Sequence, residues 1–256
     1  MAISAASSWL KNPGTSARYR LFCFPYAGGG ASAYHTWQAS FSSEIEICPV
    51  QLPGRENRIT ECPFDELPLL VQAIADVVLP YLEIPFAFFG HSMGTLISFE
   101  LARQLRRQNA PTPVHLFVAG HRAPQLPDPD APTYHLPEAD FVESLRRFNG
   151  TPETVLQSAE LMRLMLPALR ADMTISETYT YTPEEPLDCS ISAFCGMQDS
   201  EASYDSMLAW REQTRSSFRI RLLPGDHFFL RSYESLLLQA ISQDITKFLS
   251  SSSAKK

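Results

Sequence analysis

The fold is decided by the stretch Ile84-Pro85-Phe86-Ala87-Phe88-Phe89-Gly90-His91-Ser92-Met93-Gly94. Its apolar first half is typical of a buried strand, and a serine follows with a glycine two residues away on each side. This spacing favours an abrupt turn from a strand into a helix, because glycine leaves room for the chain to pass close to itself. The apolar positions of 95–105 are spaced as in a helix packed on a sheet. We therefore predict a strand–turn–helix unit with Ser92 at its apex.

Similar strand patterns recur along the rest of the chain. The six strand candidates lie at 18–24, 45–50, 84–89, 114–119, 191–195 and 218–223. Helical patterns separate or follow them at 33–41, 65–81, 95–108, 202–214 and 233–249. Alternating strands and helices of this length predict a parallel sheet with right-handed crossovers. In such sheets functional groups gather at the carboxyl ends of the strands, so partners of Ser92 should follow other strands.

One connection is much longer than the others. About seventy residues separate the strand candidates at 114–119 and 191–195. This segment opens with prolines and then shows helical patterns at 138–148 and 156–175. Because long insertions in compact domains are usually functional, we expect a helical lid at about 124–186. The alternative is a helical subdomain without a gating role.

Composition limits the class of protein. The 256 residues are 45% hydrophobic and carry a net charge of −7, which favours one domain over 1–256 and argues against nucleic-acid or membrane partners. The first residues lack the pattern of a secretory signal. The five cysteines show no C-x-x-C spacing, which suits a reducing, cytoplasmic location, and we expect neither a metal nor a cofactor. We expect a disordered tail at about 250–256.

A serine hydroxyl is a weak nucleophile, so Ser92 needs a base and a group that orients the base. After a serine in this type of turn, the chain order is acid, then histidine. His227 follows the last strand candidate and precedes the final helix, which makes it the predicted base. The remaining histidines, at positions 35, 91, 115, 121 and 135, lie elsewhere in the pattern.

The orienting acid should also follow a strand. Asp199 lies just past the strand candidate at 191–195 and is our prediction. It could instead cap the helix at 202–214. Asp226 adjoins His227, and neighbouring side chains in an extended loop point apart. Asp128 and Asp130, among prolines after 114–119, are the other candidates.

The oxyanion of an acyl-transfer intermediate needs preorganised donors. One is the backbone amide of the residue after the nucleophile, Met93. For the second we predict Ala27, with Tyr26 less suitable, in the glycine-rich loop after the first strand. The same glycines do not form a phosphate-binding motif, because neither G-x-x-x-x-G-K-[ST] nor G-x-G-x-x-G is present.

Five motifs together resemble the type II thioesterases of polyketide and nonribosomal peptide synthesis. They are Phe24-Pro25-Tyr26-Ala27-Gly28-Gly29-Gly30, Gln51-Leu52-Pro53-Gly54-Arg55-Glu56, Gly90-His91-Ser92-Met93-Gly94, Leu169-Arg170-Ala171-Asp172 and Gly225-Asp226-His227-Phe228. The resemblance implies an α/β-hydrolase fold, with a mostly parallel central sheet flanked by helices and a helical lid insertion. It also implies hydrolysis of acyl thioesters on the phosphopantetheine arm of an acyl or peptidyl carrier protein, usually to remove aberrant acyl groups.

Other interpretations remain open at this point. A carboxylesterase or lipase would use the same Ser92, Asp199 and His227. A non-catalytic binding protein on the same scaffold is disfavoured, because such descendants typically lose a member of the triad. Arginines at positions 103, 106, 107, 146 and 147 are candidates to meet an acidic carrier protein. We expect a monomer.

Overall fold

The computed structural model describes residues 8–10, 14, 16–148 and 150–253. A six-stranded sheet runs through the molecule in the order β2-β1-β3-β4-β5-β6, and all neighbouring strands are parallel. The strands are β1 (Tyr19–Phe24), β2 (Ile45–Pro49), β3 (Phe86–His91), β4 (His115–Ala119), β5 (Ser190–Gly196) and β6 (Phe218–Leu223). The predicted parallel α/β architecture is confirmed.

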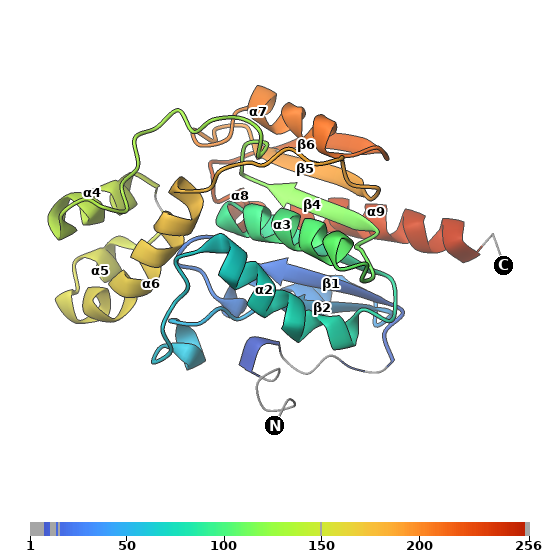
Figure 1. Ribbon diagram of the computed structural model, residues 1–256, viewed down its shortest axis with the longest axis horizontal. Helices are drawn as coiled ribbons and strands as arrows, with labels where there is room; N and C mark the ends of the chain where they lie inside the picture. Colours follow the sequence, from blue (N-terminus) through green and yellow to red (C-terminus); the bar gives the residue numbers. More distant parts are fainter. Residues whose placement is uncertain (1–7, 11–13, 15, 149, 254–256) are drawn as a thin grey trace.

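Helices cover both faces of the sheet (Figure 1). The α-helices are α2 (Leu67–Val78), α3 (Met93–Arg107), α4 (Glu138–Phe148), α5 (Glu153–Leu156), α6 (Ala159–Glu177), α7 (Tyr204–Leu208), α8 (Phe229–Ser232) and α9 (Glu234–Ser253). Short 3-10 helices are η1 (Ala31–Tyr34), η2 (Trp37–Ser40), η3 (Glu56–Arg58), η4 (Leu79–Tyr81) and η5 (Ala209–Gln213). One core layer joins the sheet to α2, α3 and α7, and a second joins it to η1, η2, α8 and α9.

Two helix predictions need correction, and a third is confirmed. The helix expected at 33–41 is two separate 3-10 turns, η1 and η2, and each places one large aromatic residue, Tyr34 and Trp37 respectively, in the core. The helix expected at 202–214 is α7, which begins where the Ser203 hydroxyl accepts from the Ser206 amide, followed by η5. The helix expected at 233–249 is confirmed as α9, which continues beyond that range, and the short helix α8 precedes it.

The end of α9 also changes the expected tail. The helix continues through Ser253, so the first residues of the segment expected to be disordered at about 250–256 are helical. Positions 254–256 lie outside the described residues. No helix in the described ranges is long and apolar enough to cross a membrane.

The long connection between β4 and β5 forms a unit of its own. Its helices α4, α5 and α6 enclose a small apolar core that includes Phe141, Leu145, Leu169 and Met173. The helix expected at 156–175 is α6, which begins at Ala159 because the Ser158 hydroxyl accepts from the Leu161 amide. Figure 1 shows this unit beyond the carboxyl ends of the strands, which is where Ser92 also lies.

Candidate active site

The turn between β3 and α3 holds Ser92 in a strained backbone conformation. Its φ is 52° and its ψ is −121°, a region that non-glycine residues seldom occupy. The Ser92 amide donates to the Ala119 carbonyl at 2.8 Å, and the Thr95 hydroxyl donates to the Gly90 carbonyl at 2.8 Å. These bonds to the neighbouring strand and helix keep the turn in place.

The two glycines of the turn are required by close packing of backbone on backbone. A Cβ on Gly94 would lie 2.1 Å from the Phe24 carbonyl oxygen, and a Cβ on Gly90 would lie 2.2 Å from the Gly94 carbonyl oxygen. Both distances are far below van der Waals contact. The glycine spacing therefore brings the start of α3 directly against the loop that follows β1.

His227 and Asp199 meet at the carboxyl ends of β6 and β5. The His227 Nδ1 lies 3.1 Å from both carboxylate oxygens of Asp199, whose side chain is 0% exposed. Asp199 Oδ1 also accepts from the Glu201 amide at 2.9 Å and the Ala202 amide at 3.2 Å. The carboxylate therefore makes both the histidine contact and the turn contact that the sequence left as alternatives. With Nδ1 donating to Asp199, the Nε2 lone pair is free to act as an acceptor.

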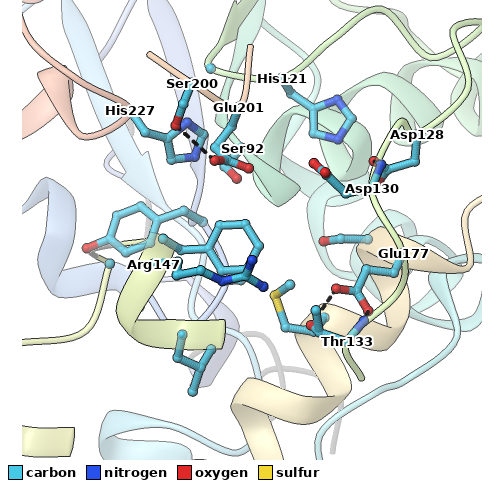
Figure 2. Close-up of a pocket in the computed structure, with 18 of the residues that line it drawn as sticks. Ser92, His121, Asp128, Asp130, Thr133, Arg147, Glu177, Ser200, Glu201 and His227 are labelled. Atoms are coloured by element: carbon cyan, nitrogen blue, oxygen red, sulfur yellow. Dashed lines mark hydrogen bonds between the residues drawn. The ribbon is translucent and has the colours of Figure 1, made fainter. Parts of the chain in front are cut away.

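The other candidate acids have different partners. Asp226 Oδ1 accepts from the Phe228 amide at 2.9 Å, which closes the turn around His227. Asp128 forms an ion pair with Arg122. Asp130 lines the cavity next to the site (Figure 2). In the described ranges none of these carboxylates bonds to the His227 ring.

Two further histidines lie close to His227. The His91 ring is buried 5.0 Å from the His227 ring, centroid to centroid, and neither of its nitrogens has a hydrogen-bond partner among the described residues. Burial, and then the neighbouring His227, hold the pKa of His91 well below its usual value. Burial also lowers the pKa of His121 to about 4. Both rings are therefore neutral near pH 7, which leaves His227 as the ring paired with a carboxylate.

The predicted oxyanion donors lie where α3 and the β1 loop meet. Met93 is the first residue of α3, and Ala27 lines the same cavity as Ser92. Across the described residues, neither backbone amide donates to another hydrogen bond, so both are available. The Tyr26 amide likewise donates to no other described group, so hydrogen bonding does not separate the two candidates, Ala27 and Tyr26.

A cavity of about 450 Å³ opens beside Ser92 and His227 (Figure 2). The insertion supplies an apolar side through Leu145, Phe148, Leu169 and Met173. A polar side carries His121, Asp130, Thr133 and Glu177. The volume of the whole cavity lies within the range of small-molecule sites.

The polar side is held together by Glu177 at the end of α6. Its carboxylate accepts from the Thr133 amide and hydroxyl, each at 2.7 Å, and from the Tyr134 amide at 2.8 Å. Sequence reasoning did not single out Glu177, Thr133 or His121 as site residues. His121 could have been found, because it follows a strand. Glu177 and Thr133 could not, because the helices of the insertion separate them in the sequence and only the fold brings them together.

A parallel sheet with a serine on a sharp strand-to-helix turn, and a histidine after the last strand, defines an α/β-hydrolase. The family model for the thioesterase domain matches residues 19–249. The chain therefore belongs to the thioesterase family and is a hydrolase. An oxygen-ester carboxylesterase or lipase is not favoured.

Individual relatives narrow the comparison. The gramicidin S biosynthesis protein GrsT of Aneurinibacillus migulanus is 51% identical over 235 residues, which cover 91% of each chain. The RedJ thioesterase of the prodiginine pathway in Streptomyces coelicolor superimposes with a TM-score of 0.83 at 38% identity over 94% of each chain. The type II thioesterase BorB of the borrelidin cluster gives a TM-score of 0.82 at 32% identity, over 92% of this chain and 97% of that one.

Proposed function

We propose that this chain is a type II thioesterase that hydrolyses acyl groups from the phosphopantetheine arm of an acyl or peptidyl carrier protein. Its role is to remove aberrant acyl groups during polyketide or nonribosomal peptide biosynthesis. The relatives named above support this role, because their names place them in gramicidin, prodiginine and borrelidin biosynthesis. The observation that carries the proposal is one cavity that unites Ser92, His227 and the insertion in a chain of this family.

In the proposed mechanism Ser92 Oγ attacks the thioester carbonyl carbon while His227 Nε2 takes the hydroxyl proton. Asp199 holds the His227 ring and stabilises the imidazolium. The amides of Met93 and Ala27 donate to the tetrahedral oxyanion. The C–S bond then breaks, the pantetheine thiol leaves with the proton from His227, and an acyl-serine ester remains. His227 next activates a water molecule, which releases the acid and restores the Ser92 hydroxyl.

We propose that the insertion serves as a lid and acyl pocket. Its apolar residues Leu145, Leu169 and Met173 line the cavity from the side opposite the sheet. Methionine and leucine side chains adapt to acyl groups of different shape. Closing such a unit over Ser92 would also exclude bulk water while the thioester reacts.

Arg147 is the arginine best placed to meet the carrier's arm. Of the five candidates, four are engaged by glutamates of this chain: Arg103–Glu100, Arg106–Glu184, Arg107–Glu184 and Arg146–Glu153. Arg147 is exposed, lines the cavity and has no ion pair within the described ranges (Figure 2). We therefore propose that it approaches the phosphate of the phosphopantetheine arm, to which it would offer a charge-assisted hydrogen bond.

We also propose that the chain works in the cytoplasm as a monomer. Free thiols at Cys23, Cys48, Cys62, Cys189 and Cys195 support a reducing compartment. All residues assigned to the site come from one chain, which supports activity without a second copy.

The test compares hydrolysis of acetyl and longer acyl groups on carrier proteins, on coenzyme A and as simple oxygen esters. We expect carrier thioesters to be preferred, and Ser92→Ala to lower kcat by about 10⁴-fold or more. Ser98→Ala is the matched control, because Ser98 lies on the same helix with its hydroxyl bonded to the Thr95 carbonyl at 2.9 Å. A preference for oxygen esters would contradict the substrate class. Full activity of Ser92→Ala would contradict the mechanism.

A further inference from the structure

Two motifs distant from Ser92 in the sequence meet in the fold. Arg55 lies in the loop after β2, and Asp172 lies on α6 of the insertion. Arg55 Nη1 donates to Asp172 Oδ2 at 2.6 Å and Arg55 Nη2 to Asp172 Oδ1 at 2.8 Å. The two side chains are 8% and 1% exposed. They form a buried, bidentate ion pair of the kind that fixes both position and orientation.

This pair also binds the loop that carries Ala27. The Gly28 amide donates to Asp172 Oδ2 at 2.7 Å, and Arg55 Nη1 donates to the Gly29 carbonyl at 3.2 Å. Gly28 and Gly29 follow Ala27 directly, so the ion pair fixes the peptide units next to the proposed oxyanion donor. Gly28 itself has a φ of +76°, and a Cβ there would lie 2.5 Å from Leu169 Cδ2 of α6. The loop and the helix are therefore in direct contact.

Asp172 sits among the residues by which α6 forms the cavity. Leu169 and Met173 lie on its apolar side, and Ser176 and Glu177 complete the same stretch of helix. One carboxylate thus connects the wall that meets the acyl group with the loop that carries an oxyanion donor. Any movement of α6 that displaces Asp172 must also disturb the hydrogen bond to Gly28.

Net stability does not explain why such a pair is present. The free-energy cost of removing two charges from water offsets most of their attraction. Proteins in which apolar residues replace a buried ion pair are therefore often as stable as the original protein. What the pair provides here is a fixed position for two segments that are 117 residues apart in sequence.

We propose that Arg55 and Asp172 are positioning residues, which hold the Ala27 amide in place for the oxyanion and couple it to the lid helix α6. This inference rests on the proposed function, since it takes Ala27 as an oxyanion donor. Misplacing a catalytic group by about 1 Å costs on the order of 10²-fold in rate. Asp172→Asn should therefore lower kcat by about 10²-fold and change KM much less.

A fluorophosphonate probe tests the same geometry without any acyl substrate. Ser92 Oγ bonds to phosphorus, fluoride leaves, His227 takes the hydroxyl proton, and the phosphoryl oxygen occupies the oxyanion site. Asp172→Asn should label about 10²-fold more slowly than the wild type. If the wild type reacts with the probe but does not hydrolyse acyl groups on carrier proteins, the proposed function is wrong. The labelling rates of the variants still test the positioning role in that case.

The chain offers a matched control in the pair Arg221–Asp244. Asp244 is 3% exposed on α9, and Arg221 donates to its two oxygens at 2.7 and 2.8 Å, so its geometry resembles that of Asp172. Asp244→Asn should lower the melting temperature but preserve kcat and the labelling rate. Equal losses of kcat in Asp172→Asn and Asp244→Asn would overturn the positioning role, as would a normal labelling rate in Asp172→Asn.

A second variant covers the case in which Asp172→Asn does not fold. The double variant Arg55→Met/Asp172→Leu removes both charges and fills their space with apolar atoms, so no buried charge remains unpaired. We expect it to fold, to show a normal far-UV circular dichroism spectrum and still to label slowly. A double variant that folds and is labelled at the wild-type rate would overturn the inference.

Discussion

At the scale of single residues, Asp199 is distinguished from its rivals by where its oxygens lie. Both face the His227 Nδ1 at 3.1 Å, whereas Asp226 bonds to a backbone amide two residues further along the chain. Substitution Asp199→Asn keeps the size but lets an amide NH₂ group face Nδ1, which favours the wrong histidine tautomer. A loss of about 10⁴-fold in kcat is expected by analogy with other triads.

The measurement is kcat/KM over a range of pH for the wild type, Asp199→Asn and Asp226→Asn. The Asp226 variant is the matched control, because it changes a carboxylate next to His227 that does not bond to the ring. It should retain most of the activity. A larger loss in Asp226→Asn than in Asp199→Asn would assign the orienting role to Asp226.

At the scale of elements, local sequence predicted the strands and the Ser92 turn well, because their determinants are neighbours in the chain. Glycine spacing and apolar runs are enough to place β3, Ser92 and α3. The sequence also allowed us to predict that His227 and Asp199 lie close together, because parallel strands bring their carboxyl ends to one edge of the sheet. In the structure the two side chains lie within hydrogen-bond distance, and their catalytic roles stay a prediction.

Other features depend on contacts that local patterns do not contain. The two 3-10 turns at Ala31–Ser40 follow from the burial of Tyr34 and Trp37, which only the packed sheet determines. The Arg55–Asp172 pair joins the loop after β2 to α6 of the insertion, so neither motif alone indicates the other. The polar side of the cavity depends in the same way on how α6 lies over the sheet.

The insertion has its own core, and this predicts separable stability. Phe141 of α4 is fully buried, and the guanidinium carbon of Arg170 on α6 lies 4.3 Å from its ring centroid. Replacing a buried phenylalanine by alanine costs about 3–5 kcal/mol. In Phe141→Ala we expect this loss to fall on α4–α6, with faster amide hydrogen exchange there and weaker turnover of long acyl chains. Exchange in β3 and α3 should remain slow.

Phe99→Ala is the matched control for that experiment. Phe99 is buried on α3 against Trp210, with ring centroids 5.3 Å apart, and belongs to the main core. Its removal should lower the stability of the whole molecule, with exchange increased in the sheet as well. If Phe141→Ala and Phe99→Ala gave the same exchange pattern, the insertion would not be a separate stability unit.

At the scale of the whole molecule, the proposed catalytic residues and the proposed acyl pocket lie on different parts of one chain. The sheet carries Ser92, Asp199 and His227 at its carboxyl edge, and the insertion supplies the opposite side of the cavity. The Arg55–Asp172 pair is a direct polar connection between these parts. On the proposed function, substitutions at Leu169 or Met173 should change acyl preference while Ser92, Asp199 and His227 stay in place.

One buried and two half-buried histidines make the stability of the whole molecule depend on pH. Burial lowers the pKa of His115 and of His121 to about 4, and that of His91 well below its usual value. Around His115, Arg221 and Arg219 lower the pKa further while Asp244 opposes them. In the unfolded chain the pKa of each ring is about 6.5. Below that pH the unfolded state binds protons that the folded state does not, so the free energy of unfolding should fall as the pH falls.

Urea unfolding between pH 7.5 and 5 measures this loss, a range above the ordinary titration of carboxylates. Each such histidine contributes up to roughly 1.4 kcal/mol per pH unit below about 6.5. His115→Gln is the informative variant, because glutamine can still bond to the Ser192 hydroxyl, which lies 2.9 Å from His115 Nε2, but cannot take up a proton. This variant should reduce the slope of the free energy of unfolding against pH by the contribution of one histidine, because its unfolded state binds one proton fewer. A slope identical to that of the wild type would show that His115 is protonated equally in both states, contrary to its half-buried position stacked on Phe117.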